Sequence, residues 1–342
     1  MLLLAIETSC DETSAAVVEN GTKVLSNVVA SQTEFHKKYG GIVPEIASRK
    51  HIEVINPIIA EALEKAGKKF KDLDAVAVTY GPGLVGSLLV GLCAAKAIAW
   101  SLKIPLIGVN HLEGHIYANF LNSHLPSPIS LFPFLCLIVS GGHTLIVEVK
   151  DHGKYKVLGR TRDDAAGEAF DKVARFLNLG YPGGPIIDKL AKEGDPHAVE
   201  FKRPMIEKEF GYDFSFSGIK TAVVNYVNKV GGTATLVAGG TRLADLVASF
   251  QQAVVETLVE KTIQAALNHK IKTVALAGGV SANSALRKHL TERGGGEGLR
   301  VLIPPLEYTT DNAAMIACAA YYRFKKKQFS DLTLKPVASL KL

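Results

Sequence analysis

Cysteine is scarce in this sequence, and its few cysteines lie far apart. None belongs to a C-x-x-C pair, so the sequence predicts neither a disulfide framework nor a zinc knuckle. Most lie in apolar segments, where a free thiol behaves as a small hydrophobic side chain. The four cysteines are Cys10, Cys93, Cys136 and Cys318.

Long apolar runs are also missing. The apolar start of the chain ends at Glu7, which is too early for a signal-peptide core or a membrane span. The most apolar later segment, Gly83 to Leu102, contains Lys96 and several glycines. These features favour a buried helix over a span, so we expect a soluble, cytoplasmic protein with no membrane partner.

Two familiar catalytic motifs are absent. The sequence has no G-x-x-x-x-G-K-[ST], which excludes a P-loop NTPase. It also lacks the H-E-x-x-H of zinc proteases, because Leu112 and not a glutamate follows His111. A metalloprotease therefore becomes an alternative with little support.

Charge is only mildly unbalanced. The 342 residues carry a formal net charge of +6, with 47% apolar residues, which is enough for a large core and two domains. Basic residues gather at 65–71 and 323–327. Such runs are usually solvated faces, but they are also where a nucleic acid would bind, so the charge permits a polyanionic partner without requiring one.

A duplication is visible along the chain. Residues 2–30 and 134–160 share a pattern of three apolar strands, in which a small, hydroxyl-rich turn follows the first strand. Helix and strand patterns alternate after each copy, which predicts two α/β lobes of similar plan. The expected elements are strands at 2–6, 15–18, 23–30, 74–79, 135–139, 145–149, 155–158 and 273–277, and helices at 45–65, from 84, at 243–267 and from about 281.

Prolines and glycines mark expected interruptions. Pro57 should bend or split the helix at 45–65. The glycine-rich segments 231–240 and 294–298 are expected to be surface loops. The turns at 140–144 and 277–283 place glycine pairs after apolar strands, where backbone N–H groups could bind a phosphate or nucleotide. A tight turn is the simpler alternative, but we take the two turns to occupy matching places in the two lobes.

Two histidines four residues apart suggest a metal site. On a helix, His111 and His115 share one face, and a third ligand must come from elsewhere. Asp311, just before the last helical segment, is the candidate. Two imidazoles and one carboxylate with open positions suit iron or zinc. Glu113 should point away from the shared face, and a coincidental histidine pair is the alternative.

The sequence resembles one known family along nearly its whole length, the bacterial-type tRNA N6-adenosine threonylcarbamoyltransferases, formerly called O-sialoglycoprotein endopeptidases. Each shared motif is weak alone, but their number and order are specific. They lie at residues 6–13 (IETSCDET), 39–51, 81–83, 111–115 (HLEGH), 139–144 (VSGGHT), 163–172 (DDAAGEAFDK), 181–185, 214–218, 277–283 (AGGVSAN) and 310–312 (TDN).

The resemblance implies a fold and a set of site residues. The fold would be two-lobed, actin-like and sugar-kinase-like, a duplicated βββαβαβα unit with the active site in the interlobe cleft. We expect an N-terminal lobe over 1–130, a C-terminal lobe over 131–310, and a C-terminal helix over 311–342 that returns to the first lobe. One divalent metal per subunit would be held by His111, His115 and Asp311, with iron expected and zinc or magnesium as alternatives. Substrate contacts would come from Ile138, Val139, Ser140, Gly141, Gly142, Asp171, Gly184, Asp188 and Asn283.

The resemblance also implies a reaction. The threonylcarbamoyl group of threonylcarbamoyl-adenylate would pass to N6 of adenosine 37, in tRNAs that read codons beginning with A, and AMP would leave. Asp11 and Glu12 are candidate proton acceptors, with turn or cap roles as the alternative. A paralogous actin-like subunit and a small ATPase would be partners. A metalloprotease and a non-catalytic scaffold are the rival classes.

Two departures from the family pattern are visible. Ala313 stands where the family commonly has glycine. The tail at 335–342 lacks the expected Arg-Trp-Pro-like ending, which leaves the role of the C-terminus open.

Overall fold

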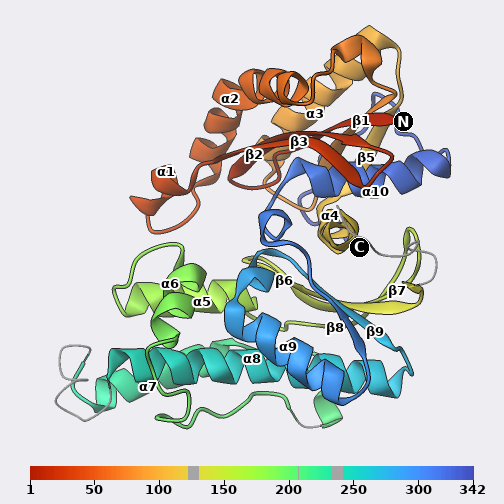
Figure 1. Cartoon of the computed structure of the whole chain (residues 1–342). Helices are drawn as coiled ribbons and strands as arrows, with labels where there is room; N and C mark the ends of the chain where they lie inside the picture. The colour runs from red at the N-terminus through yellow and green to blue at the C-terminus, as the bar shows by residue number, and fades with distance from the viewer. Residues whose placement is uncertain (122–130, 207, 233–241) are drawn as a thin grey trace. The chain divides into compact units, whose positions relative to one another are not determined.

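The computed structural model describes residues 1–121, 131–206, 208–232 and 242–342 (Figure 1). The chain forms two compact units. Unit 1 comprises Met1–Ser130 and Pro304–Leu342, and unit 2 comprises Leu131–Ile303. Most of the glycine-rich segment expected as a loop at 231–240 lies outside the described residues.

Unit 1 is built on a five-stranded sheet with strand order β3-β2-β1-β4-β5. β1 pairs antiparallel with β2 on one side and parallel with β4 on the other. All six residues of β1 are buried, as expected for a strand covered on both faces. The strands are β1 (Leu2–Glu7), β2 (Glu12–Glu19), β3 (Lys23–Ser31), β4 (Ala75–Gly81) and β5 (Leu106–Asn110).

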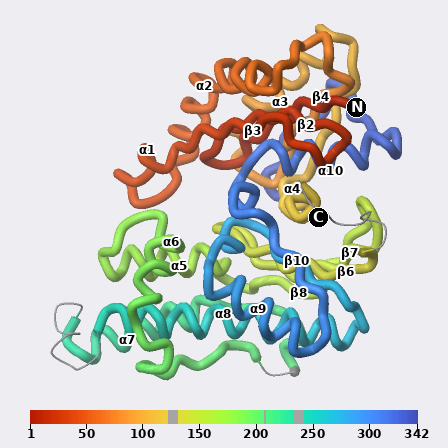
Figure 2. The backbone as a smooth tube through the Cα atoms, viewed as in Figure 1, coloured from red at the N-terminus to blue at the C-terminus, as the bar shows by residue number. Residues whose placement is uncertain are grey.

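Helices cover both faces of this sheet (Figure 1). α2 and α3 pack on one face, and α10 packs on the other, where it also contacts α4. The first strands and the last helix of the chain therefore pack together, since α10 lies against β1 and β2 (Figure 2). The helices are α1 (Thr33–Lys37), α2 (Pro44–Lys65), α3 (Val85–Leu102), α4 (His111–Tyr117) and α10 (Ala313–Lys325).

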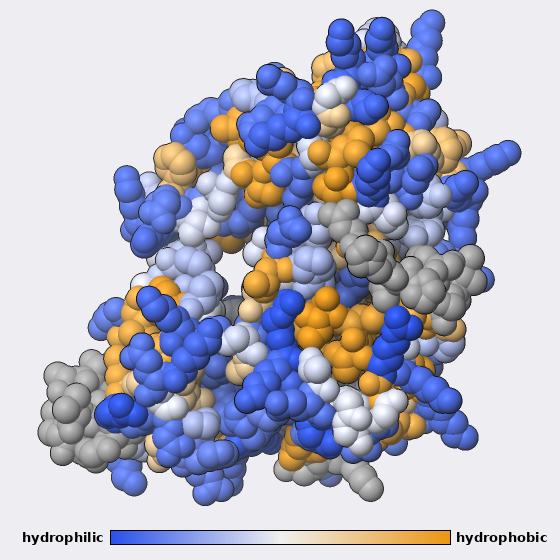
Figure 3. Space-filling view, in the orientation of Figure 1, coloured by the Kyte–Doolittle hydropathy of each residue, from blue (hydrophilic) through white to orange (hydrophobic). Residues whose placement is uncertain are grey.

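α3 is the one described helix that is long and apolar enough, by length and composition, to cross a membrane. One face of it, with Leu88, Leu92 and Ala95, is buried in unit 1. The opposite face leaves Leu89 and Trp100 in solvent, and Trp100 is 72% exposed. Figure 3 shows such apolar patches separated by polar side chains over α2 and α3. The buried face is what the predicted core helix requires.

Unit 2 repeats the sheet plan of unit 1. Its strand order is β10-β9-β6-β7-β8, in which β6, β7 and β8 are antiparallel and β9 and β10 are parallel additions. The predicted duplication of two α/β lobes is confirmed. The strands are β6 (Phe134–Val139), β7 (Thr144–Asp151), β8 (Lys154–Arg160), β9 (Thr273–Ala277) and β10 (Arg300–Leu302).

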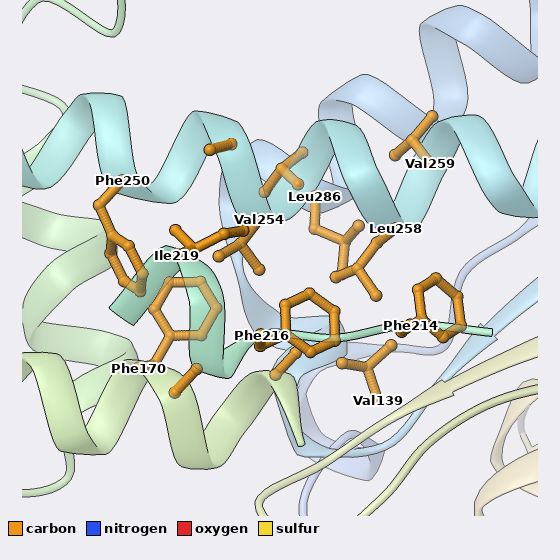
Figure 4. Close-up of a cluster of buried hydrophobic side chains, with 14 of the residues drawn as sticks. Val139, Phe170, Phe214, Phe216, Ile219, Phe250, Val254, Leu258, Val259 and Leu286 are labelled. Atoms are coloured by element: carbon orange, nitrogen blue, oxygen red, sulfur yellow. The ribbon is translucent and has the colours of Figure 1, made fainter. Parts of the chain in front are cut away.

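The helices of unit 2 enclose a core rich in phenylalanine. Phe170 of α5 meets Phe250 of α8 edge to face, with ring centroids 5.5 Å apart (Figure 4). Phe214 and Phe216 stack nearby, and Val139 at the end of β6 points into the same cluster. The helices are α5 (Ala166–Phe176), α6 (Gly183–Ala191), α7 (Ser217–Lys229), α8 (Leu243–Asn268) and α9 (Ser284–Gly296). Short 3₁₀ turns are η1 (Phe70–Asp72), η2 (Ala118–Phe120), η4 (Lys208–Phe210), η6 (Gly279–Ala282) and η7 (Leu306–Tyr308).

Of the two effects expected at Pro57, a split does not occur, because α2 continues through it. Two other local expectations were wrong. The supposed loop at 294–298 begins inside α9, which continues to Gly296. Gly294 is buried, and a side chain there would collide with Val301. The helix expected over 311–342 ends at Lys325, and Lys327 adopts φ 54°, which stops the helical path.

The two glycine turns also lie differently from expectation. Both belong to unit 2, where they follow the neighbouring parallel strands β6 and β9, so they are not equivalent turns of two lobes. They lie at the carboxyl edge of a single sheet, which is the usual place for ligand-binding turns in α/β folds.

Candidate functional site

The histidine pair lies at the start of α4, directly after β5. Asn110 caps this helix, since its side-chain oxygen accepts a hydrogen bond from the Leu112 N–H at 2.9 Å. His111 is therefore the first helical residue and His115 follows one turn later. Both rings are buried, and their centroids are 4.6 Å apart. The predicted shared helix face is confirmed.

Asp311 reaches the same point from the segment before α10. Its Oδ1 lies 3.5 Å from His111 Nε2 and 3.2 Å from His115 Nε2. The ligand atoms of the three residues all lie within 4.8 Å of one another. We call these residues the His–His–Asp group. Its residues all belong to unit 1, and 196 positions separate His115 from Asp311.

The donor set fits a metal ion. Ligands bound about 2.1 Å from a tetrahedral ion lie roughly 3.4 Å apart, close to the spacing of the two nitrogens from Asp311. His115 is fully buried, its Nδ1 has no hydrogen-bond partner among the described residues, and its Nε2 lies 3.2 Å from Asp311 Oδ1. Buried polar atoms are rarely left in this state without a ligand.

Glu7, at the end of β1, contacts Nδ1 of His111, the ring nitrogen on the opposite side from Asp311. Its Oε2 lies 3.1 Å from His111 Nδ1 and accepts a hydrogen bond from Thr79 Oγ1. Ser9 Oγ lies 3.1 Å from the same Nδ1. Glu7 is fully buried. Sequence reasoning missed this support, although a lone carboxylate that ends an apolar strand was a usable signal.

In the metal-free protein, burial and neighbouring charges have opposing effects on the pKa values of Glu7 and His111. Burial alone would lower the pKa of His111, but the carboxylates of Asp311 and Glu7 raise it to about 9. Burial lowers the pKa of His115, and the neighbouring His111 adds to that effect. Burial would raise the pKa of Glu7, but His111 outweighs it and keeps the pKa below its ordinary value. The group thus combines a protonated His111 with a neutral His115 near pH 7.

Asp11 lies in the turn between β1 and β2, and Glu12 is the first residue of β2. Glu12 accepts a hydrogen bond from Ser31 Oγ at 3.2 Å. Burial raises the pKa of Glu12 well above its ordinary value, and the nearby charges of Asp11 and Asp311 raise it further. The two predicted proton acceptors therefore share an acidic neighbourhood with the His–His–Asp group.

Glu113 does not belong to this group. Its buried carboxylate accepts a hydrogen bond from Arg323 Nε of α10 at 2.9 Å. The prediction that Glu113 points away from the histidine face is confirmed. Sequence reasoning did not find this pair, because 210 positions separate the partners.

The predicted phosphate turn lies in unit 2. Ile138 and Val139 are buried at the end of β6, and the next residues leave the sheet. Ser140 N–H donates to the His143 carbonyl at 2.8 Å, and Ser140 Oγ accepts from His143 N–H at 3.1 Å. Gly141 and Gly142 are exposed, and nothing lies within 4 Å of a Cβ at either position.

The other predicted substrate residues lie at helix beginnings of unit 2 or contact them. Asp171 accepts from the Gly183 N–H at the start of α6, and Gly184 beside it has open space around it. Asp188 accepts from the N–H of Ser284 at the start of α9, at 3.1 Å. The amide of Asn283 caps α9 and donates to Gln251 Oε1 at 2.7 Å. These polar groups therefore position helix ends around the turns.

Comparison with known proteins gives consistent matches. A family model described as tRNA N6-adenosine threonylcarbamoyltransferase matches residues 23–318. A protein of that name from Clostridioides difficile (strain 630) is 54% identical over 349 residues, covering 100% of this chain and 98% of that protein. One from Clostridium perfringens (strain SM101 / Type A) is 55% identical over 341 residues, with 100% and 98% covered.

A solved structure resembles the fold. Full-length HypF in its phosphate- and nucleotide-bound form matches with a TM-score of 0.63 at 14% sequence identity, covering 96% of this chain and 47% of that chain. At this identity the likeness concerns the fold alone, and it confirms the predicted two-lobed, actin-like α/β architecture. Because a family model and full-length relatives agree, the chain belongs to the tRNA N6-adenosine threonylcarbamoyltransferase family and is a transferase.

Proposed function

We propose that this protein transfers the threonylcarbamoyl group of threonylcarbamoyl-adenylate to N6 of adenosine 37, in tRNAs that read codons beginning with A. The observation that carries the proposal is the end-to-end similarity to transferases of that name. In the reaction, a bond forms between N6 and the carbamoyl carbon. The anhydride bond to phosphate breaks, and AMP leaves with the electron pair.

The His–His–Asp group is the proposed metal site. Two imidazole nitrogens and one carboxylate oxygen suit iron or zinc better than magnesium, which prefers oxygen ligands. Iron is the expected metal, one per subunit, with zinc and magnesium as alternatives. A bound divalent cation would supply Lewis acidity toward the carbonyl or the leaving phosphate. Glu7 would hold His111 so that Nε2 faces the cation, because the proton then stays on Nδ1.

The acidic turn of unit 1 supplies candidate proton acceptors. The adenine N6 must lose a proton when it attacks the carbamoyl carbon. We propose Glu12 or Asp11 for this role. Support comes from the raised pKa of Glu12, because a carboxylate with a raised pKa is a stronger base once it is ionised.

Unit 2 is proposed to bind the donor nucleotide. The exposed glycines after Ser140 offer backbone N–H groups, which suit a phosphate. We assign Asp171 and Asp188 to hydroxyl groups of the ribose, and Gly184 to the open surface against the adenosine. Asn283 would act by fixing the start of α9. The expected location of the active site, in a cleft shared by both lobes, stays a prediction.

The proposed partners follow from the family resemblance. They are tRNA, a paralogous actin-like subunit and a small ATPase, and we place the reaction in the cytoplasm. A protease role is disfavoured by the missing H-E-x-x-H motif, in which a glutamate on the histidine helix serves as the base. The nearest candidate on α4, Glu113, is instead bound to Arg323.

The test supplies threonylcarbamoyl-adenylate, unmodified tRNA and purified partner subunits. Mass spectrometry of tRNA nucleosides should show threonylcarbamoyladenosine, and AMP should appear in equal amount. The double variant His111→Ala, His115→Ala should lose transfer while its circular dichroism stays unchanged. Release of AMP without tRNA modification, or full activity in the double variant, would overturn the proposal. Cleavage of peptides would instead favour the protease alternative.

A further inference from the structure

The last residues of the chain return to the sheet of unit 1. After α10 ends at Lys325, Ser330 forms an antiparallel bridge with Leu106 of β5. The Ser330 N–H donates to the Leu106 carbonyl at 2.8 Å, and Ser330 Oγ accepts from Gly108 N–H at 3.0 Å. The tail therefore runs beside β5, the strand that leads directly into α4.

The tail next contacts the turn after β4. Val337 N–H donates to the Tyr80 carbonyl at 2.8 Å, and Gly83 N–H donates to the Ala338 carbonyl at 3.1 Å. A Cβ at Gly81 would collide with the Val337 carbonyl oxygen, so the tail approaches this closely only because position 81 is glycine. On its other side the same turn holds Ser9, whose carbonyl accepts from Leu84 N–H at 2.8 Å.

The final contact is with the cap of α4. Asn110 Nδ2 donates to the Lys341 carbonyl at 3.0 Å, while Asn110 Oδ1 accepts from the Leu112 N–H. One buried amide side chain thus joins the tail to the first turn of the helix that begins with His111. The C-terminus accordingly lies beside α4 in Figures 1 and 2.

This contact matters because α4 is short. A helix of seven residues cannot hold its own shape, so tertiary contacts must fix it. Metal ligands need positions fixed to roughly 0.5 Å. The tail, by contrast, buries little: Val337, Ala338, Ser339 and Lys341 are all exposed. Its bonds are therefore better suited to positioning α4 than to supporting the core.

We propose that residues 337–342 form a C-terminal strap that positions α4 and, through Asn110, sets the affinity of the His–His–Asp group for its cation. This inference rests on the proposed metal site. It assigns a role to a tail whose sequence departs from the family pattern, and it makes Asn110 a positioning residue that lies outside the ligand set.

The first test is Asn110→Asp in the full-length chain. The variant keeps the shape and the oxygen that caps α4, but it replaces the donor to Lys341 with an oxygen that repels that carbonyl. Titration with Co²⁺, followed by its d–d absorption, should show about tenfold weaker binding, the size typical of losing an outer support of a metal ligand. The added negative charge would by itself favour a cation, so weaker binding cannot come from charge.

Lys341→Ala is the matched control, because it removes the exposed side chain and leaves the carbonyl in place. It should bind Co²⁺ as the natural protein does. Thermal unfolding should be similar in both variants. Unchanged Co²⁺ affinity and absorption in Asn110→Asp would overturn the strap.

A second variant separates the strap from a simple capping defect. A chain that ends at Pro336 should lose Co²⁺ affinity to the same extent as Asn110→Asp. Combining the two changes should weaken Co²⁺ binding no more than either change alone, because both remove the same hydrogen bond between Asn110 and the tail. Fully additive losses, or normal affinity in the shortened chain, would contradict the strap. If the natural protein bound no Co²⁺ at all, the metal site itself would fail, which is a different result.

Discussion

The carboxylate of Glu7 and the carboxylate of Asp311 contact opposite nitrogens of the His111 ring. A proton on Nδ1 can be shared with Glu7, which leaves the lone pair of Nε2 directed at the point that Asp311 and His115 also reach. Outer carboxylates of this kind orient a metal-binding histidine and increase its basicity.

Glu7→Gln should therefore weaken cation binding. We expect a loss of about tenfold to a hundredfold in Co²⁺ affinity. The pKa of His111 in the metal-free protein should fall, because one of the two carboxylates that raise it is gone. Co²⁺ titration and an NMR titration of the imidazole measure the two effects. Glu64→Gln, at an exposed position of α2, is the control, and an unchanged His111 pKa would contradict the assignment.

Cation binding should depend on pH through His111. Below its pKa of about 9, a cation must displace the proton on Nε2, so affinity should rise with pH and level off above 9. Calorimetry of Co²⁺ binding at pH 7.5, in two buffers of different ionisation enthalpy, should detect release of about one proton. Binding without proton release would show that His111 is already neutral.

The same pKa has a consequence for metal-free stability. A pKa raised above the ordinary value of 6.5 stabilises the fold below pH 6.5, and this contribution is lost as pH rises through about 9. The metal-free protein should therefore lose the stabilising contribution of His111 between pH 7 and pH 10, so its free energy of unfolding should be lower at pH 10.

Part of the site was predictable from single residues. The spacing of His111 and His115 implies a shared helix face, and the structure confirms that face. Asp311 could be named only as a candidate, because no spacing rule connects a residue before α10 with α4. Glu7 and Asn110 were not identified, since each acts through contacts more than 100 positions away in the chain.

Among the elements, α4 and α10 are joined by an ion pair whose carboxylate is buried and whose guanidinium is partly exposed. Glu113 of α4 is 1% exposed, and Arg323 of α10 donates to it. Because of this pair, Arg323 is held against α4 and is a poor candidate for a phosphate contact, although it lies in a basic run.

Arg323→Met should leave the carboxylate of Glu113 buried without this cation. We expect the free energy of unfolding to fall by about 3 kcal/mol. The double variant Arg323→Met, Glu113→Leu should recover much of the loss, because the buried charge is then removed as well. Urea unfolding measures both. Lys326→Met, at an exposed position nearby, should be almost neutral, and an equally small effect at Arg323 would show that the pair contributes little.

Element boundaries were predictable where the pattern was regular. Strand β9 matches its expected residues, and α8 starts at the expected Leu243. Glycine-rich sequence misled at 294–298, because Gly294 is required by close packing against Val301 and not by a turn. The end of α10 was missed because residues 326–342 are fixed by distant contacts with β4 and β5, which local pattern does not encode.

At the scale of the whole molecule, the repeated sheet plan follows directly from the two three-stranded patterns in the sequence. The alternation of apolar strands and helices is encoded by short stretches of sequence, so it can be recognised in the sequence of each unit. The predicted site between the lobes is a property of their arrangement and stays a prediction.

The net charge of +6 agrees with the proposed tRNA substrate, and the run at 65–71 offers a test. Lys68, Lys69 and Lys71 precede β4, whereas the His–His–Asp group lies beyond the opposite ends of β1 and β5. A strand the length of β4 spans about 23 Å. A docked tRNA can cover that distance, but substitutions there should leave the cation site unaffected.

The triple variant Lys68→Glu, Lys69→Glu, Lys71→Glu should bind tRNA at least about tenfold more weakly near 0.1 M salt, with a shallower salt dependence. Filter binding across a salt series measures both, and Co²⁺ affinity should stay unchanged. Reversal of Lys150, Lys154 and Lys156 in unit 2 is the matched control. Equal losses in both triple variants would indicate a general charge effect and not a docking surface.

The return of α10 to the first unit sets the order in which a newly made chain can mature. Unit 2 is contiguous, so it can fold once residue 303 has left the ribosome, whereas unit 1 must wait for its last 39 residues. Asp311 is in that late segment. A nascent polypeptide released before residue 311 would keep a folded middle but would lack Asp311, so the proposed metal site can be completed only late in synthesis.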